Sequence, residues 1–310
     1  MSSASFTAEL ARFGPDEAAA PPSPEEARAY CRNLARTHYE NFTVASWLLP
    51  RALRQHFYHV YAYCRWADDL ADEVHEPGRS EALLDWWEEQ LDACYRGDAR
   101  HPVFVALRET IDEFAIPAEP FRDLLTAFRQ DQRQTRYETV DDLLGYCRNS
   151  ANPVGRLVLY LGRCHSPERV GLSDSICTGL QLANFCQDVA RDYERGRIYL
   201  PLESWQQAGY DEGNFSRHEN NVAFHDLLKT EVDRAERFLR AGESLPGLMP
   251  PELRMQIALF INGGLAIVRK IRELDYDVWS RRPVVGKWDK LRIAWNSFWQ
   301  TRRMPDGGAP

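Results

Sequence analysis

Two clusters of aspartates are the residues of this chain whose type and spacing are best suited to chemistry. The first lies in the segment YAYCRWADDLADE at residues 61–73, where Asp68 and Asp72 are four positions apart and Asp69 stands between them. In a helix, residues four apart share a face, so these two carboxylates point the same way. Arg65, three positions before Asp68, adds a cation at the edge of that face. Like charges at this spacing repel one another, and a bound cation would relieve the repulsion.

The second cluster lies in the segment LQLANFCQDVARDYERGRIYLP at residues 180–201. Asp188 and Asp192 are again four positions apart, and Gln181 and Asn184 continue the same stripe toward the N-terminus. The neighbours of this stripe are apolar. A solvated face more often carries Lys and Glu, so the pattern indicates a helix that lines an internal polar cavity.

The aspartates offer only oxygen ligands, which favours Mg²⁺, or Mn²⁺ in its place, over zinc. Mg²⁺ usually binds through one or two carboxylates together with waters and substrate phosphates. One acidic pair on a helix is typical of a solvated face. Two pairs, one with a polar stripe behind it, favour a site for metal ions and a diphosphate.

The elements that position these clusters are predicted to be helices. Apolar residues recur at helical spacing, no series of alternating strands is present, and breaks such as Glu76-Pro77-Gly78 have turn chemistry. We therefore expect an all-α fold with a single helical domain at 25–301, a flexible N-terminal segment at 1–24 and a disordered tail at 302–310. The helical segments are predicted at about 25–38, 51–73, 80–96, 102–114, 119–134, 139–149, 153–163, 168–195, 219–242, 250–277 and 286–301.

Composition excludes several classes of protein. The 310 residues are 44% hydrophobic, enough for a sizeable core, and a net charge of −8 argues against nucleic acid as the main partner. Seven cysteines without a CxxC pair are typical of a reduced, cytoplasmic protein. No apolar run is long enough to span a bilayer and no signal peptide is visible, although peripheral contact with the inner face of a membrane stays open.

The two motifs together resemble the squalene/phytoene synthase family of head-to-head trans-prenyltransferases. The similarity runs from about residue 30 to about residue 290. The resemblance implies an antiparallel helical bundle of the isoprenoid synthase type around a central apolar cavity, with the aspartates at its mouth. Metal ions held there would help a prenyl diphosphate to ionise, and aromatic faces would stabilise the cation. For each aromatic residue, packing in the core is the alternative.

The resemblance also assigns residues to roles. Mg²⁺ ions would be held by Asp68, Asp69, Asp72, Asp188 and Asp192. The substrate would contact Arg65, Gln181, Asn184, Arg191, Tyr61, Asn41 and Phe42, and Tyr146 and Asn152 would act close to the reacting atoms.

Local departures from the family pattern favour one branch, the hydroxysqualene synthases, which ionise presqualene diphosphate and add water. Glu40 and Asn41 stand where condensing members tend to be basic, and Gln187 stands where many relatives have arginine. Asn152 is either a residue that positions water or the start of a helix broken by an Asn-Pro pair. No nicotinamide motif is seen, so NADPH is not expected. The product would pass to a squalene-forming enzyme of squalene and hopanoid biosynthesis.

Two other functions remain open at this point. The chain could instead be a condensing synthase that makes presqualene diphosphate or phytoene from two prenyl diphosphates. It could also be a non-catalytic assembly or binding protein, although such relatives tend to have lost their aspartates.

Overall fold

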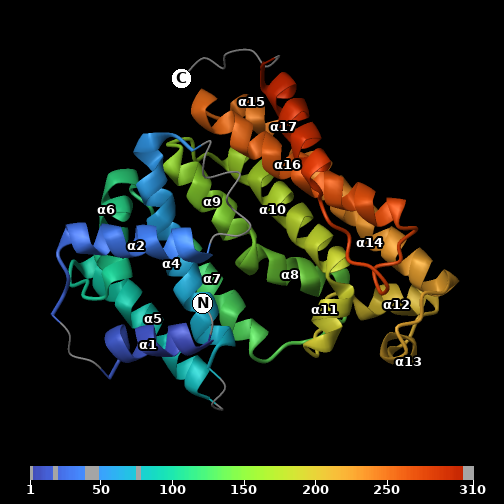
Figure 1. Ribbon diagram of the computed structural model, residues 1–310, viewed down its shortest axis with the longest axis horizontal. Coiled ribbons are helices and arrows are strands. Elements are labelled where there is room, and N and C mark those ends of the chain that lie inside the picture. Colours follow the sequence, from blue (N-terminus) through green and yellow to red (C-terminus); the bar gives the residue numbers. More distant parts are fainter. Residues whose placement is uncertain (1–2, 17–19, 39–48, 75–77, 303–310) are drawn as a thin grey trace. The chain divides into compact units, whose positions relative to one another are not determined.

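A computed structural model describes residues 3–16, 20–38, 49–74 and 78–302, and all regular elements among them are helices. The predicted all-α fold is therefore confirmed. The chain divides into two compact units: unit 1 holds residues Met1–Arg133 and Leu157–Arg163, and unit 2 holds Gln134–Arg156 and Cys164–Pro310. Figure 1 labels the helices of both units.

Unit 1 is organised around one long helix, α4, which carries the first aspartate cluster. Helices α2, α5, α6 and α7 all pack against α4. The contact is rich in aromatic rings, since Trp66 of α4 stacks on Trp87 of α5 at 5.3 Å between centroids, and both are fully buried. Rings of this size dominate the burial of a core and hold α4 in place. The bounds in this unit are α1 Ser3–Phe13, α2 Pro24–His38, α4 Arg51–Asp72, α5 Arg79–Arg96, α6 Pro102–Phe114 and α7 Glu119–Asp131.

Unit 2 is organised around α10, which carries Gln181 and Asn184, ends directly before Asp188 and packs closely on α14. Gly179 makes the close approach possible, because a Cβ at that position would lie only 2.7 Å from the backbone nitrogen of Leu239. Helix α16 packs on both, and α17 packs on α16. The bounds are α8 Val140–Ser150, α10 Pro167–Gln187, α11 Val189–Glu194, α12 Leu202–Ala208, α13 Glu212–Ser216, α14 Val222–Ala241, α15 Leu245–Leu248, α16 Pro251–Glu273 and α17 Lys287–Arg302; α9, Asn152–Leu161, has residues in both units.

Helix starts follow from local sequence. The Ser166 hydroxyl accepts a hydrogen bond from the backbone N–H of Arg169, and Pro167 occupies the first turn of α10. Thr139 and Asp142 form a reciprocal capping box at the start of α8. These caps satisfy N–H groups that have no partner inside the helix, which is why the predicted starts of both helices lie within one residue of the observed ones.

The N-terminal segment differs from the prediction. Instead of a flexible lead-in over 1–24, the structure has α1 at Ser3–Phe13. Phe6 is only 1% exposed and meets the edge of Trp66 at 5.3 Å between ring centroids. The composition of this segment, rich in Ala, Ser and Pro, gave no indication of this aromatic contact. The predicted tail at 302–310 lies outside the described residues except for Arg302, which ends α17, and the central apolar cavity stays a prediction.

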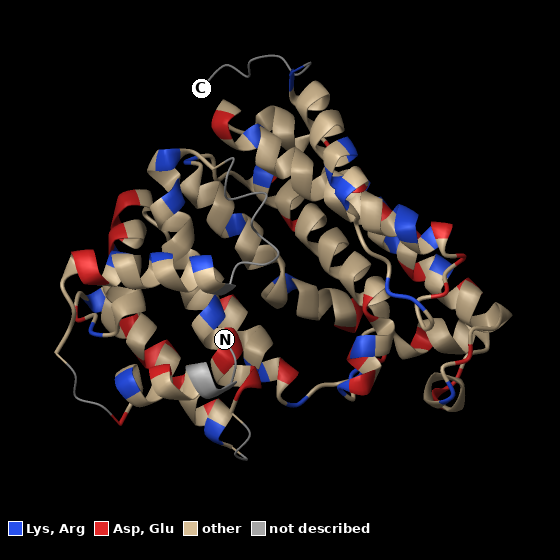
Figure 2. Ribbon diagram, viewed as in Figure 1, with Lys and Arg blue, Asp and Glu red and all other residues tan. Residues whose placement is uncertain are grey.

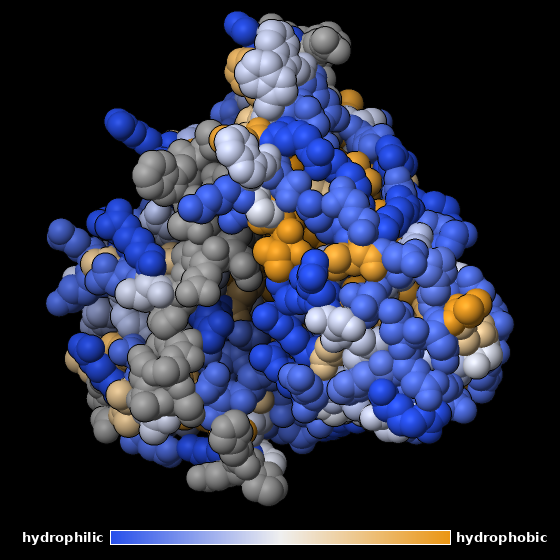
Figure 3. All heavy atoms as spheres, turned by 45° about the vertical axis from the view of Figure 1, so that its right-hand side comes forward, coloured by the Kyte–Doolittle hydropathy of each residue, from blue (hydrophilic) through white to orange (hydrophobic). Residues whose placement is uncertain are grey.

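The cysteines are unpaired thiols, as expected from their spacing in the sequence. All seven cysteines are free thiols, and five of them are buried. Burial raises the pKa of Cys94 and of Cys147 to about 12, so these thiols stay protonated. No helix in the described part of the chain is both long and apolar enough to cross a bilayer. The face drawn in Figure 3 is largely hydrophilic, with a few hydrophobic side chains gathered near its middle.

Candidate active site

The first aspartate cluster lies in the last two turns of α4. Arg65 donates from Nε to Oδ2 of Asp69 at 3.0 Å and also contacts Oδ1 of that residue, while its other terminal nitrogen lies 3.2 Å from Oδ2 of Asp68. The Asp69 side chain has no exposed surface, whereas that of Asp68 is 44% exposed and Asp72 is exposed. Asp69 therefore serves to hold Arg65, and the accessible carboxylates of this set are those of Asp68 and Asp72.

The electrostatics of this set favour a bound cation. The pKa of Asp68 is raised to about 6: loss of solvent is the largest cause, the charges of Asp72 and Asp69 add to it, and Arg65 opposes it. A divalent cation at Asp68 and Asp72 would offset the repulsion between these two carboxylates, since the charge of Asp72 raises the pKa of Asp68.

The second cluster lies at a break between two helices. Helix α10 ends at Gln187 and α11 begins at Val189, with Asp188 between them at φ −107° and ψ 16°. The prediction of one continuous helix over 168–195 is therefore wrong at this point. The spacing of the pair survives the break, because the backbone N–H of Asp192 donates to the carbonyl oxygen of Asp188 at 2.9 Å. The two side chains thus stay within one turn of each other.

Arg282 is a residue of this site that the sequence did not indicate. It donates from Nε to Oδ1 of Asp188 at 2.5 Å and from a terminal nitrogen to Oδ2 at 2.9 Å, a two-pronged ion pair between residues far apart in the chain. This geometry fixes the orientation of the Asp188 carboxylate. The only signal was the Arg281-Arg282-Pro283 run, which has no helical or motif context.

Asp192 is the most perturbed carboxyl group of this set. Loss of solvent and the charge of Asp188 raise the pKa of Asp192 to about 7, against the lowering effects of Arg195, Arg197 and Arg282. A carboxyl group that is half-protonated near neutral pH is ready to exchange its proton for a metal ion. Figure 2 shows acidic residues both on α4 and at the junction of α10 and α11.

The polar stripe along α10 is accessible to solvent, whereas the internal polar cavity that it was expected to line stays a prediction. Asn184 is exposed and Gln181 is half-buried, so both amides are accessible from the same side as Asp188. The flanking residues pack inward, with Leu182 2% and Phe185 7% exposed. The stripe therefore faces an accessible region while its neighbours build the core of unit 2.

Two neighbours of the stripe differ in their placement. Gln187 is buried and donates from Nε2 to the carbonyl oxygen of Pro283 at 2.5 Å, so it holds the chain next to Arg282. Arg191 is largely exposed, and its guanidinium lies 3.8 Å from the carboxylate of Asp188. The guanidinium of Arg191 is therefore free to contact a phosphate group bound near Asp188. The side chain of Gln187 instead donates its hydrogen bond to Pro283.

Tyr146 belongs to a cluster of four aromatic rings in unit 2. Phe185 and Tyr199 stack with their centroids 4.0 Å apart and their planes 9° from parallel, and Tyr146 lies 5.9 Å from Tyr199. Tyr137 completes the cluster at 5.6 Å from Tyr146. Tyr137 and Tyr199 were missed by sequence reasoning, because Tyr137 lies in neither motif and Tyr199, although within the segment 180–201, lies outside its polar stripe. The cluster presents π-faces and phenol groups in the same unit as Asp188.

The remaining predicted site residues are placed as follows. The Asn152 side chain is buried, and its Oδ1 accepts a hydrogen bond from the Thr178 hydroxyl at 2.9 Å, which favours the structural alternative over a water-positioning role. Tyr61 is half-buried on α4, and burial raises its pKa. Asn41 and Phe42 lie outside the described residues.

Comparison with known proteins decides the family. The family model described as squalene/phytoene synthase matches residues 35–289 of the chain. The chain belongs to this family. The predicted resemblance is thereby confirmed over most of its length, both aspartate clusters included.

Relatives within the squalene/phytoene synthase family include a phytoene synthase, a squalene synthase and a dehydrosqualene synthase. A phytoene synthase of Arthrospira platensis is 30% identical over 274 residues, covering 84% of this chain and 89% of the relative. The solved squalene synthase HpnC from Alicyclobacillus acidocaldarius is 44% identical, with a TM-score of 0.79 over 83% of this chain and 97% of that one. A dehydrosqualene synthase solved with a ligand is 26% identical, with a TM-score of 0.81 over 90% of this chain and 98% of that one.

The side chains of the two sets fit Mg²⁺. Among the described residues, no three His, Cys, Asp or Glu side chains converge as a ready-made metal cage. The two sets instead offer accessible carboxylates in pairs, with the pKa of Asp68 raised to about 6 and that of Asp192 to about 7. Such pairs suit a metal that takes most of its remaining ligands from water and from phosphate oxygens.

Proposed function

We propose that this member of the squalene/phytoene synthase family is a hydroxysqualene synthase. The reaction would convert presqualene diphosphate and water to hydroxysqualene and diphosphate. The observation that carries the proposal is the 44% identity to the squalene synthase HpnC over nearly all of that chain, against 30% for the phytoene synthase. Gln187 also supports the proposal, because its side chain is neutral and already donates a hydrogen bond to the carbonyl oxygen of Pro283. A site that binds two diphosphates would be stabilised by a cationic side chain at this position.

The chemistry begins with the departure of diphosphate. The C–O bond breaks, its electron pair leaves with the diphosphate, and a carbocation remains. Asp68, Asp72, Asp188 and Asp192 would hold Mg²⁺, with Asp69 acting through Arg65; when bound, Mg²⁺ supplies Lewis-acid stabilisation of the leaving group. Arg65, Arg191, Gln181 and Asn184 would donate hydrogen bonds to the phosphate oxygens.

The second stage is the capture of the cation. The cyclopropyl ring opens as the cation rearranges, the oxygen of a water molecule forms the new C–O bond, and one proton of that water is lost. The stacked rings of Phe185 and Tyr199, together with Tyr146, would stabilise the positive charge through their electron-rich faces. We propose that Tyr61 contributes a further aromatic face to the stabilisation of the cation. A dry apolar surrounding limits capture to one position.

Product analysis tests this proposal. Purified protein with Mg²⁺ and presqualene diphosphate should release a C30 alcohol, and oxygen-18 water should label its hydroxyl group. Addition of NADPH should leave the product unchanged. The absence of turnover with presqualene diphosphate would overturn the proposal.

A second candidate is a condensing synthase that joins two prenyl diphosphates. The phytoene synthase and dehydrosqualene synthase relatives favour it. Farnesyl diphosphate and geranylgeranyl diphosphate should therefore be offered separately. A C30 or C40 product from either one would favour this candidate over the first.

The proposed substrate and product also bear on where the enzyme works. A C30 alcohol is almost insoluble in water, so we propose a cytoplasmic enzyme that works at the inner face of a membrane and passes its product to a squalene-forming enzyme. Fractionation of cells tests this. Recovery of the protein only in the soluble fraction at low ionic strength would contradict it.

A further inference from the structure

Helix α17 exposes an apolar stripe. Trp288 is 85% exposed, Leu291 62% and Trp295 63%, and these residues recur every three to four positions. That spacing places them on one face of the helix. Phe298 and Trp299 extend the same stripe toward the C-terminal end and are also exposed.

The polarity of α17 is the reverse of that of an ordinary surface helix. The side turned toward α16 buries Ile293 and Ser297, and the Ser297 hydroxyl accepts a hydrogen bond from Nδ2 of Asn262 at 2.8 Å. A surface helix normally turns its apolar side inward and its polar side to water. Here the larger apolar residues face outward, and a contiguous exposed patch of this kind indicates an interaction surface.

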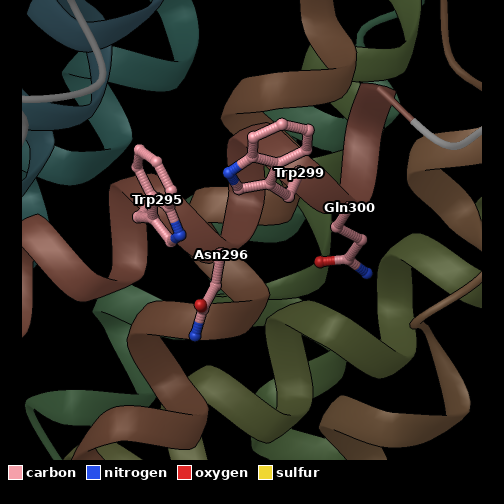
Figure 4. A pocket seen from close by; sticks show the side chains of 4 residues that line it. All are labelled: Trp295, Asn296, Trp299 and Gln300. Carbon is pink, nitrogen blue, oxygen red and sulfur yellow. The ribbon is translucent and has the colours of Figure 1, made fainter.

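The tryptophans of α17 are of the residue type that is enriched at the interface between a lipid bilayer and water. Figure 4 shows Trp295 and Trp299 beside Asn296 and Gln300, around an open hollow on the surface of α17. The two indole rings meet edge to face at 5.7 Å between centroids. Tryptophan combines a broad apolar ring with one N–H donor, which suits the headgroup level of a bilayer.

The positive charge of α17 indicates what kind of partner it binds. Helix α17 carries four basic residues and one acidic residue, a net charge of +3 in a chain whose net charge is −8. Figure 2 shows basic residues along this helix, and Lys287 and Lys290 are both exposed. The guanidinium of Arg302 lies over the ring of Phe298 at 5.3 Å, so a cation adjoins the stripe. Positive charge around an apolar face is complementary to an anionic lipid surface.

We infer that α17 is a membrane-docking helix that lies flat on an anionic lipid surface, with Trp288, Leu291 and Trp295 inserted among the headgroups. A second copy of the chain fits this face less well, because a symmetric contact would bring the basic residues of both copies together. A membrane surface accepts both the stripe and its charge. The inference goes beyond the chemical reaction and holds for any prenyl substrate of the enzyme.

Vesicle binding by the full chain tests the inference. The protein should sediment with vesicles of phosphatidylcholine and phosphatidylglycerol, and less with phosphatidylcholine alone. The double variant Trp288→Gln/Trp295→Gln should lower the partition coefficient by about tenfold or more. Val222→Gln, which changes a 78% exposed apolar side chain on α14, is the matched control and should bind as the natural protein does.

A second variant separates the contribution of charge. Lys287→Gln/Lys290→Gln should weaken binding to the anionic vesicles by about fivefold for each charge removed and should change little with phosphatidylcholine. Turnover of either variant in detergent micelles should equal that of the natural protein, so a failure of docking is distinguishable from a failure of catalysis. Unaltered thermal unfolding would show that the folds are intact.

Three results would overturn the inference. One is that the natural protein does not sediment with anionic vesicles. Another is that the tryptophan variant binds them as well as Val222→Gln does. The third is a dimer, seen by analytical ultracentrifugation without lipid, that the tryptophan variant converts to monomers, because a second copy would then be the occupant of this face.

Discussion

Replacement of Arg282 by glutamine should leave the charge of Asp188 in place while it removes the two hydrogen bonds that orient its carboxylate. The natural guanidinium makes two charge-assisted hydrogen bonds to Asp188, at 2.5 and 2.9 Å, and the two side chains are 34% and 23% exposed. Hydrogen bonds to charged groups contribute about 1.5–3 kcal/mol, and partial exposure to solvent reduces this to about 1–2 kcal/mol of folding stability. We therefore expect Arg282→Gln to lower the free energy of unfolding by that amount.

The effect on function should be larger than the effect on folding. Groups that orient a metal ligand typically account for about 10–100-fold in metal affinity or activity. Arg282 also lowers the pKa of Asp192, so its removal should move the uptake of Mg²⁺ to higher pH. Calorimetric titration of Mg²⁺ in the presence of diphosphate measures the affinity, and urea unfolding of the metal-free protein measures the stability.

Arg281→Gln provides the matched control for this experiment. Arg281 is the adjacent residue, carries the same charge and is exposed. Its replacement should change stability by no more than about 0.5 kcal/mol and should leave Mg²⁺ affinity unaltered. If the two variants behave alike in both measurements, Arg282 does not position Asp188 and the reasoning is refuted.

Three further predictions concern other parts of the molecule. The pKa of Asp192 is raised from its usual 3.8 to about 7, so folding favours the protonated form and metal-free stability should fall as pH rises from about 4 to above 7. In Asp192→Asn, the decrease in the free energy of unfolding between these pH values should be smaller by about 1–2 kcal/mol, after allowance for solvent exposure. The measurement is unfolding at a series of pH values, and the same pH dependence in the variant would refute the raised pKa of Asp192. Asp72→Asn should lower turnover by several orders of magnitude with an unaltered fold, whereas Asp98→Asn, an exposed acid of the same unit, should not; equal rates would exclude Asp72 from the site. Phe6→Ala should cost about 3 kcal/mol in thermal or urea unfolding because Phe6 is buried against Trp66, and a loss as small as that of Val222→Ala would mean that α1 contributes little.

The grouping of the aspartates that we propose as Mg²⁺ ligands was visible in the sequence, because it depends on local spacing. Asp68 and Asp72 share a face as soon as α4 forms, and so do Gln181 and Asn184 on α10, which ends directly before Asp188. Most helix bounds were predicted for the same reason, since apolar period and caps act within a few residues. The short helices α12, α13 and α15 were missed because fewer than two turns give too little periodicity to detect.

Contacts between distant segments were decided only by the tertiary structure. The pairing of Arg282 with Asp188 joins positions 94 residues apart, and no spacing rule connects them. The same holds for Phe185 and Tyr199, which stack although a helix break and a loop separate them.

Helix α17 shows why the sequence predicts a helix but not which of its sides is buried. Its tryptophans recur at helical period, and that period by itself gives a helix with an apolar side. Which side meets α16 and which meets solvent depends on the neighbours that pack on it, and here Ile293 and Ser297 take the inner position while Trp288 and Trp295 stay exposed. Sequence thus determined the helices and the chemistry of their faces, because both follow from local geometry. Tertiary packing decided which faces are buried, which carboxylates are oriented by an arginine, and which apolar side is left for a partner.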